Sequence, residues 1–181
     1  AVNLKLAAST MGGTFSGTAT AGNITQTGAL DIEGVTTLVT LGQGADIDLA
    51  ANGTGNAFTS ELLITTNETG SDIDADVSID GGTTNLILGT STIDGDLSLR
   101  SGGTITDTDG STVTVKGTLT AKTDASDRII TLDDLAVTGA FTLDPDGTGA
   151  VTIVNDVNLL LAVSTMGGTF SGTATTGNIT Q

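Results

Sequence analysis

The segment NLKLAASTMGGTFSGTATAGNITQ, residues 3–26, returns almost unchanged as residues 158–181, which lie 155 positions further along the chain. The two copies differ only at Lys5/Leu160, Ala8/Val163 and Ala21/Thr176. Self-similarity at a fixed period is typical of solenoids and tandem arrays, in which each repeat packs on its neighbours. We therefore expect residues 1–181 to form one continuous domain that completes a 155-residue period and enters the next.

A shorter period runs inside the long one. Short runs of alternating apolar residues recur about seven times per long period, which gives about 22 residues per unit. The units begin at Val2 (VNLKL), Gly28 (GALDI), Gly44 (GADIDL), near Gly70 (SDIDADVSI), Gly95 (GDLSL), Gly117 (GTLTA) and Gly139 (GAFTL), and Val157 (VNLLL) opens the second period. Their uneven spacing indicates coils that are joined by loops of different lengths.

The residues within a unit follow a period of two. In TVTVKGTLTA, residues 112–121, the apolar residues Val113, Val115, Leu119 and Ala121 alternate with Thr and Lys. This alternation is typical of a strand with one buried face. Only four Phe and no Trp or Tyr are present, so Val, Ile, Leu, Ala and Thr must supply the core. Together these features predict an all-β fold, a parallel β-helix (β-solenoid) of about 22 residues per coil.

Glycine separates the predicted strands. The pairs Gly81-Gly82, Asp109-Gly110 and Asp146-Gly147 are examples, and glycine provides the positive φ that a tight corner needs. Helix signals are scarce, and the best candidate for a short helix is the glycine-free stretch Thr118–Thr138.

The charge of the chain and the length of its apolar runs limit what it can bind or span. Five Lys and Arg residues face 21 Asp and Glu residues, for a formal net charge of −16. Nucleic-acid binding needs clustered cations, so we expect no nucleic-acid partner. The longest apolar run, Leu159–Val163, is far shorter than a membrane span, so we expect no membrane-spanning segment.

The residue types also limit the chemistry. The absence of His and Cys excludes nucleophilic triads and imidazole or thiolate metal sites. Paired carboxylates can cleave polysaccharides, but grooves of that kind usually present aromatic platforms, which this chain almost lacks. We expect no enzyme activity and no resident cofactor, and keep a polysaccharide-degrading β-helix enzyme as the distant alternative.

Two turns carry the pattern Asp-x-Asp-Gly, and oxygen ligands on a tight turn suit Ca²⁺. The candidate calcium ligands are Asp107 and Asp109 in one turn and Asp144 and Asp146 in the other, and Asp72, Asp74 and Asp76 alternate along a strand and would add oxygens. Neither turn continues to the Glu of an EF-hand. The alternative is that Asp-Gly is simply favourable turn chemistry, and the sequence leaves both interpretations open.

Two longer segments carry a resemblance to a known family. GDLSLRSGGTITDTDGSTVTVKGTLTA (residues 95–121) and GAFTLDPDGTGAVTIVNDVNLLLA (residues 139–162) resemble the repeats of filamentous-haemagglutinin-type adhesins and other giant repetitive bacterial surface proteins. The resemblance implies a right-handed parallel β-helix, export from the cell, and a role in adhesion, matrix or sheath.

We therefore expect an extracellular or cell-surface structural filament or rod segment. Its main partner would be further copies of itself, joined in tandem or stacked head to tail. The alternative is the stalk or binding module of a bacterial adhesin, which binds a glycan or a host or cell-surface protein through the longest loops, near Ala50–Glu61.

Overall fold

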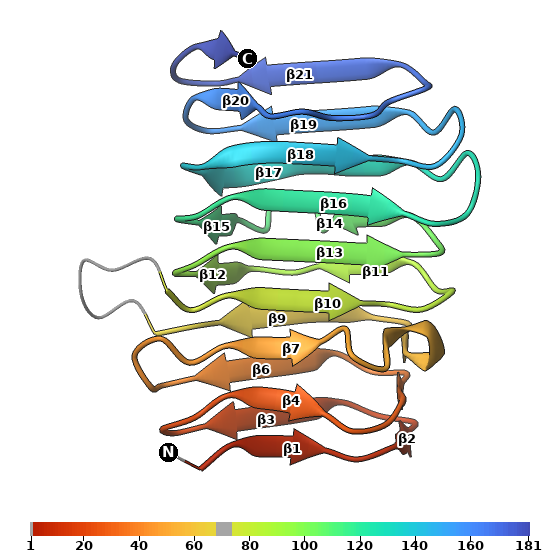
Figure 1. Ribbon diagram of the computed structural model, residues 1–181, viewed down its shortest axis with the longest axis vertical. Helices are drawn as coiled ribbons and strands as arrows, with labels where there is room; N and C mark the ends of the chain where they lie inside the picture. Colours follow the sequence, from red (N-terminus) through yellow and green to blue (C-terminus); the bar gives the residue numbers. More distant parts are fainter. Residues whose placement is uncertain (1, 68–73) are drawn as a thin grey trace.

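The computed structural model describes residues 2–67 and 74–181 and shows a single stack of coils built from parallel strands (Figure 1). The coil nearest the N-terminus lies at the bottom of the stack in Figure 1, and the C-terminal coil lies at the top. Every strand pairing in the described part of the chain is parallel and joins successive coils. The predicted β-solenoid fold is confirmed.

Two long sheets and one short sheet form the walls. Within the described residues, the front sheet contains β1 (Leu4–Leu6), β4 (Ile24–Gln26), β7 (Ile47–Leu49), β10 (Val77–Asp80), β13 (Leu97–Ser101), β16 (Leu119–Thr123), β18 (Ala140–Asp144), β20 (Leu159–Leu161) and β22 (Ile179–Thr180). The back sheet contains β3 (Phe15–Ala19), β6 (Thr36–Thr40), β9 (Glu61–Thr65), β11 (Leu86–Leu88), β12 (Ser91–Ile93), β14 (Ile105–Asp107), β15 (Val113–Val115), β17 (Ile130–Val137), β19 (Val151–Asn155) and β21 (Phe170–Ala174). The side sheet contains β2 (Ser9–Met11), β5 (Leu30–Ile32) and β8 (Ala57–Phe58), and a 3₁₀ turn, η1, spans Gly53–Gly55.

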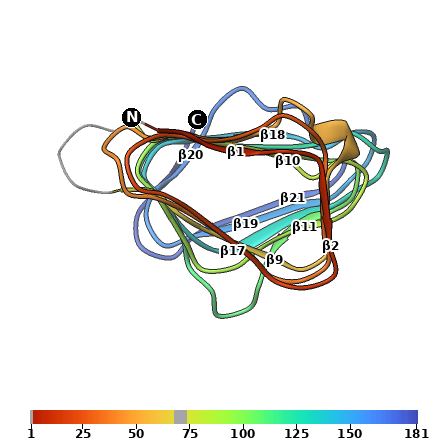
Figure 2. The same cartoon turned by 90° about the horizontal axis from the view of Figure 1, so that it is seen from below.

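We number the coils by their front strands, so that coil 1 begins at β1, coil 7 at β18 and coil 8 at β20. The front strands point to the right in Figure 1 and the back strands point to the left. Seen from below in Figure 2, the chain turns clockwise as it moves away from the viewer. The solenoid is therefore right-handed, the sense that parallel crossover connections prefer.

The core lies between the front and back sheets and is almost entirely aliphatic. Alternate residues of each strand face inward, so Leu97 and Leu99 of β13 are buried while Ser98 and Arg100 are exposed. The predicted inward set, Val113, Val115, Leu119 and Ala121, is buried. Full burial of a Val, Leu or Ile side chain contributes about 1.5–3 kcal/mol, so a long column of such residues stabilises the stack without large aromatics.

Glycine serves the corners in two ways. Gly82, Gly110 and Gly147 have positive φ angles of 63°, 76° and 68°, as predicted for tight turns. Gly117 and Gly139 are needed for a different reason, because the two backbones stack directly. The Gly139 nitrogen donates to the Gly117 oxygen at 3.0 Å, and a Cβ on Gly139 would collide with that oxygen.

The stretch Thr118–Thr138, the best candidate for a helix, contains strands β16 and β17 instead. The apolar residues of β17 follow a period of two, and this pattern is interrupted only by a bulge between Leu132 and Leu135. The bulge adds one residue and leaves Asp133 and Asp134 only partly buried, so both halves of the strand keep their apolar side chains inside.

Seven coils make one long period. Successive pairings in the front sheet connect Leu4 with a residue in each coil above it: Ile24, Ile47, Val77, Leu97, Leu119, Phe141 and finally Leu161. Leu161 lies 157 residues after Leu4, whereas the sequence counterpart of Leu4 is Leu159. The second copy is therefore set back by two residues along the coil, and an even offset keeps every inward residue inward.

Candidate functional site

The feature of this molecule that most directly suggests a function is the repeated segment, which occurs in two different surroundings. As residues 3–26 it forms coil 1 and the start of coil 2, and as residues 158–181 it forms coil 8 and the strand that follows. We call it the repeated module. Its internal pairing is the same in both places, since Leu4 pairs with Ile24 and Leu159 pairs with Ile179.

In its second position the repeated module rests on coil 7. Strand β21 pairs with β19 along its whole length, from Val151↔Phe170 to Asn155↔Ala174, and β20 pairs with β18. At the corner between them, the Thr165 nitrogen donates to the Leu143 oxygen at 3.0 Å and the Leu143 nitrogen donates to Ser164 Oγ at 3.0 Å. The lower side of the module therefore fits the upper side of coil 7.

In its first position the upper side of the module is covered instead. Strand β6 pairs with β3 from Phe15↔Thr36 to Ala19↔Thr40, and β7 pairs with β4 through Ile24↔Ile47. The two copies together thus show one module with both of its sides packed, by coil 7 below and by coils 2 and 3 above. The 155-residue period can be continued through the module with contacts that the structure already contains.

The two copies of one tripeptide differ in local structure because their neighbours differ. Ser9–Met11 forms strand β2 since it pairs with β5 in the coil above. Its counterpart, residues 164–166, is not a strand, and coil 7 offers it the turn after β18 rather than a strand edge. Met11 and Met166 nonetheless occupy corresponding places seven coils apart, between a front and a back strand, and both pack against the core.

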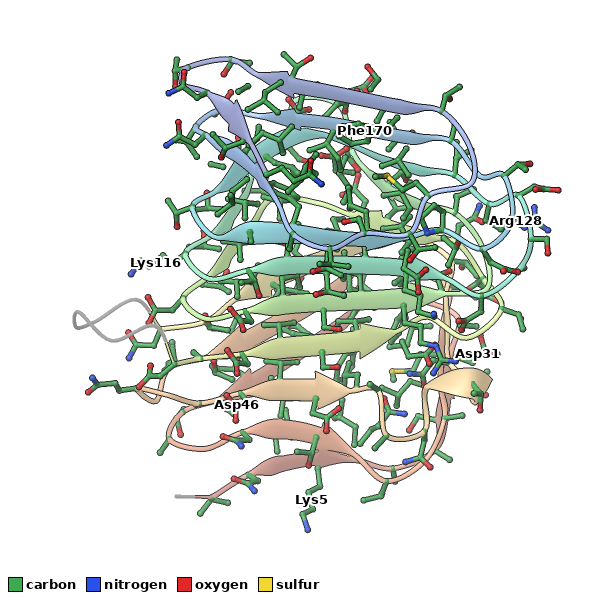
Figure 3. All side chains as sticks on the ribbon, turned by 45° about the horizontal axis from the view of Figure 1, so that its top comes forward. Lys5, Asp31, Asp46, Lys116, Arg128 and Phe170 are labelled. Atoms are coloured by element: carbon green, nitrogen blue, oxygen red, sulfur yellow. The ribbon has the colours of Figure 1, made fainter. Side chains whose placement is uncertain are left out.

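A column of side-chain oxygens runs up the corner before the front sheet. We call it the Asx column, and each member accepts a hydrogen bond from the backbone nitrogen of the corresponding residue one coil above. The bonds run from the nitrogen of Asn23 to Asn3 Oδ1 (3.1 Å), Asp46 to Asn23 Oδ1 (3.1 Å), Asp76 to Asp46 Oδ1 (3.0 Å), Asp96 to Asp76 Oδ1 (2.8 Å), Thr118 to Asp96 Oδ1 (2.7 Å), and Asn178 to Asn158 Oδ1 (3.0 Å). Figure 3 shows Asp46 at this corner.

The Asx column gives the stack a direction. A side-chain acceptor always lies in the lower coil and its backbone donor in the upper coil, so the upper and lower sides of a coil are not interchangeable. This column was not predicted from the sequence, although its signal is present there as Asn or Asp directly before an alternating apolar run.

Ion pairs between successive coils form a second column. Asp80, Arg100, Lys122 and Asp144 are paired in register in the front sheet. Arg100 lies 3.9 Å from Asp80 and 2.6 Å from Asp124, and Lys122 lies 2.5 Å from Asp144. These pairings raise the pKa of Arg100 and of Lys122. The signal that could have revealed them is a separation of one coil, 20 to 24 residues, between each cation and its acid.

The candidate calcium ligands lie at two separate corners: Asp107 and Asp144 end β14 and β18, and Asp109 and Asp146 lie in the turns that follow. Asp144 pairs with Lys122, and Asp146 accepts a hydrogen bond from Ser126 Oγ at 3.0 Å. Asp109 lies in an exposed turn before Gly110. Within the described residues, no three acidic side chains are placed to hold a metal ion. Calcium binding at these turns stays a prediction.

Asp107 and Asp76 have structural partners of their own. The Asp107 carboxylate accepts hydrogen bonds from the backbone nitrogens of Asp133 (3.1 Å) and Asp134 (2.9 Å), so it closes the bulge of β17. Burial raises the pKa of Asp107 to about 6, against the effect of these hydrogen bonds. Asp76 belongs to the Asx column, and Asp72 lies outside the described residues.

The segment Ala50–Glu61, predicted as a long loop, is largely built into the stack. It contains η1 and β8, and it carries the buried Asn56. Asn56 Nδ2 donates to Gln26 Oε1 (3.1 Å), the Leu49 oxygen (3.0 Å) and the Asp80 oxygen (2.9 Å), and Asn56 Oδ1 accepts from Gln26 Nε2 (3.1 Å) and the Leu30 nitrogen (2.9 Å). Thr59 and the tip around Asn52 and Thr54 are exposed, and Figure 2 shows η1 at a corner of the coil.

Comparison with known proteins identifies a family. The family model described as repeats of unknown function (DUF5649) matches residues 1–65 and 74–144, which together cover most of the chain. The gap between the two matched segments falls in coil 3, where Ile47 and Val77 are paired although they lie 30 residues apart. No curated protein and no solved structure matches the chain. In the described residues, no helix has the length and apolar character needed to cross a membrane.

Proposed function

The chain belongs to the family of repeats of unknown function (DUF5649), and from that premise we propose that it is a segment of an extracellular structural filament. The filament is a rod in which the 155-residue period continues in tandem, one module after another. Its function is to supply length and stiffness outside the cell, as a surface fibre, sheath or matrix. No catalytic step is part of this proposal.

One observation carries the proposal. The repeated module packs with coil 7 on its lower side and with coils 2 and 3 on its upper side, in two places in one molecule. A tandem chain can therefore be extended by repeating contacts that are already present, without a break in the hydrogen-bond ladder or the aliphatic core. Repeat proteins of this kind gain stability from each added neighbour contact.

The composition supports a location outside the cell. Five Lys and Arg residues in 181 leave few sites for trypsin-like proteases, and the resemblance to filamentous-haemagglutinin-type repeats points the same way. The net charge of −16 opposes side-by-side association of rods at low salt through mutual repulsion.

The test is electron microscopy of cells that produce the protein, with gold-labelled antibodies raised against the exposed turn at Asp109–Gly110. We expect labelled, continuous thin fibres outside the cell wall. Labelling confined to the cell interior would contradict the extracellular location, and labelled isolated particles outside the cell would contradict the filament.

A second candidate function, an adhesin stalk, is favoured by the corner at η1 (Figure 2), where Asn52 and Thr54 are exposed. An adhesin would bind a glycan or a cell-surface protein saturably at this corner. Binding of the purified chain to glycan arrays and to cells, with Thr54→Arg as the variant and Thr14→Arg as a control in another connection, measures this function. Saturable binding that only Thr54→Arg abolishes would support the adhesin.

A further inference from the structure

We propose that the upper side of coil 7 is an exchangeable docking site for a second copy of this chain. Residues 158–181 occupy the site in cis, and residues 3–26 of the second copy would occupy it in the same way. This inference rests on the proposed filament function for its biological meaning. The second copy would bind this site when the cis module is displaced.

The two modules present the same contacts to coil 7. The residues that pack or bond there, Leu159, Leu161, Ser164, Phe170 and Thr175, correspond to Leu4, Leu6, Ser9, Phe15 and Thr20 in the first module. Each of these pairs is identical in residue type, so residues 3–26 can make the same apolar and polar contacts.

The three positions at which the copies differ do not prevent this exchange. Leu160 (39% exposed) and Val163 (92% exposed) point largely to solvent, so Lys5 and Ala8 are tolerated in their places. Lys5 is exposed in its own coil, and Figure 3 shows it at the N-terminal end. Thr176 Oγ1 donates to the Asp156 oxygen, a bond that Ala21 lacks. The cis module therefore has a small advantage, which adds to its high effective concentration.

The lower side of the first module carries the apolar side chains that the contact needs. Leu4, Leu6, Met11 and Phe15 of this module are only partly buried and pack against the core from one side. These are the counterparts of the side chains that rest on coil 7 in the second copy. Docking of one on the other would bury the same apolar groups in the same register.

The geometry of the contact predicts the form of the product. The upper side of coil 7 meets the lower side of coil 1, so the contact is heterologous and does not close on itself. Exchange would therefore give linear head-to-tail polymers with a seven-coil period and a displaced residue 158–181 segment at every junction. Direct stacking of Ile179–Thr180 on β1 would instead create a pairing that the structure does not contain.

Matched substitutions in the two copies test this proposal. Leu159 is fully buried against coil 7, so Leu159→Asp should release the cis module and leave residues 3–26 unchanged. We expect the native chain to be monomeric by sedimentation and light scattering, and the Leu159→Asp chain to form polymers whose mass rises with concentration. Leu4→Asp should be monomeric, and Leu4→Asp with Leu159→Asp should also be monomeric, because the trans module is then damaged.

A pair of cysteine substitutions reports the register of the junction. Thr152 pairs with Ser171, whose counterpart is Ser16, so the Leu159→Asp chain carrying Thr152→Cys and Ser16→Cys should form an interchain disulfide. The matched control combines Thr152→Cys with Thr37→Cys, since Thr37 pairs with Ser16 from above, and should not cross-link. If Leu159→Asp loses its β-sheet circular dichroism, the Thr152→Cys and Ser16→Cys pair in the otherwise native chain at high concentration provides the test, and an interchain disulfide is again expected.

Several results would overturn the inference: a monomeric, folded Leu159→Asp chain, polymers that persist in the double variant, or no interchain disulfide in the chain that carries Thr152→Cys and Ser16→Cys. The proposed function and the docking inference are contradicted by different results. If fibres are found outside the cell while Leu159→Asp stays monomeric, only the docking inference is wrong. If Leu159→Asp polymerises in register but no extracellular fibres exist, the docking site stands and the filament function is wrong.

Discussion

At the scale of single residues, this protein relies on a few buried polar groups that join neighbouring coils. Asn56 contacts coils 2, 3 and 4 through Gln26, Leu49 and the Asp80 oxygen. Asn155 acts similarly near the top of the stack, where its Oδ1 accepts from the Val137 nitrogen at 2.8 Å and its Nδ2 donates to the Val137 oxygen at 2.9 Å. A buried amide of this kind fixes a corner, because each unsatisfied partner would cost free energy.

Replacement of Asn56 tests this role. Asn56→Ala removes the side-chain partner of the buried Gln26 Oε1 and of the Leu30 nitrogen, and we expect it to lower the free energy of unfolding by about 2–3 kcal/mol. Asn52→Ala is the matched control, since Asn52 is exposed in the same segment, and it should change that free energy by less than about 0.5 kcal/mol. Chemical denaturation measures both values, and equal stabilities of the two variants would contradict the structural role of Asn56.

Asp107 predicts a pH dependence of stability. Burial raises its pKa from 3.8 to about 6, so the folded state binds this proton more tightly than the unfolded state does. Its contribution to stability is therefore fully present below about pH 4 and is lost as the pH rises through about 6. We expect the difference in Tm between Asp107→Asn and the native chain to shift in favour of the variant across this range. A difference that stays constant between about pH 4 and pH 7 would contradict this assignment.

At the scale of elements, the strands and the coil length could be predicted from the sequence. A run such as TVTVKGTLTA shows the period of two that is typical of a strand, and the recurrence of such runs gives the coil length. The bulge in β17 could not be predicted, since Asp133 and Asp134 look like turn residues until the pairing with β19 is known. The end of the side sheet after β8 also depends on contacts between coils rather than on local residues. The Asx column was visible in the sequence but required knowledge of which residues stack.

Deletions distinguish the bulge from a regular strand. The bulge opposes two residues of β17 to one of β19, so deletion of Asp134 should keep Leu135 and Val137 facing inward and cost only moderate stability. Deletion of Thr120 from β16 should turn Ala121 outward, because a one-residue slip reverses the two faces of a strand. We expect a cooperative thermal transition by circular dichroism for the first deletion and none for the second. The reverse order of stability would contradict the observed register.

At the scale of the whole molecule, the chain is a directional stack that contains one full 155-residue period and part of a second. The aliphatic core, the parallel ladders, the Asx column and the ion-pair column all join each coil to the next. Leu159, the sequence counterpart of Leu4, is set back by two residues from the position seven coils above Leu4. This even offset preserves the inward face of every strand, so one period can be joined to the next. The long repeat in the sequence indicated this continuity, and the packing of the module in two places supplies its physical basis.

The most direct measurement is the length of chains that contain one, two and three tandem copies of the 155-residue period followed by residues 156–181, imaged by cryo-electron microscopy. Seven coils at the strand spacing of about 4.8 Å advance the stack by about 34 Å. We predict unbranched rods whose length increases by about 34 Å with each added period while their cross-section stays constant. Chains that form separate globules joined by linkers, or rods whose length does not follow the number of periods, would contradict the account.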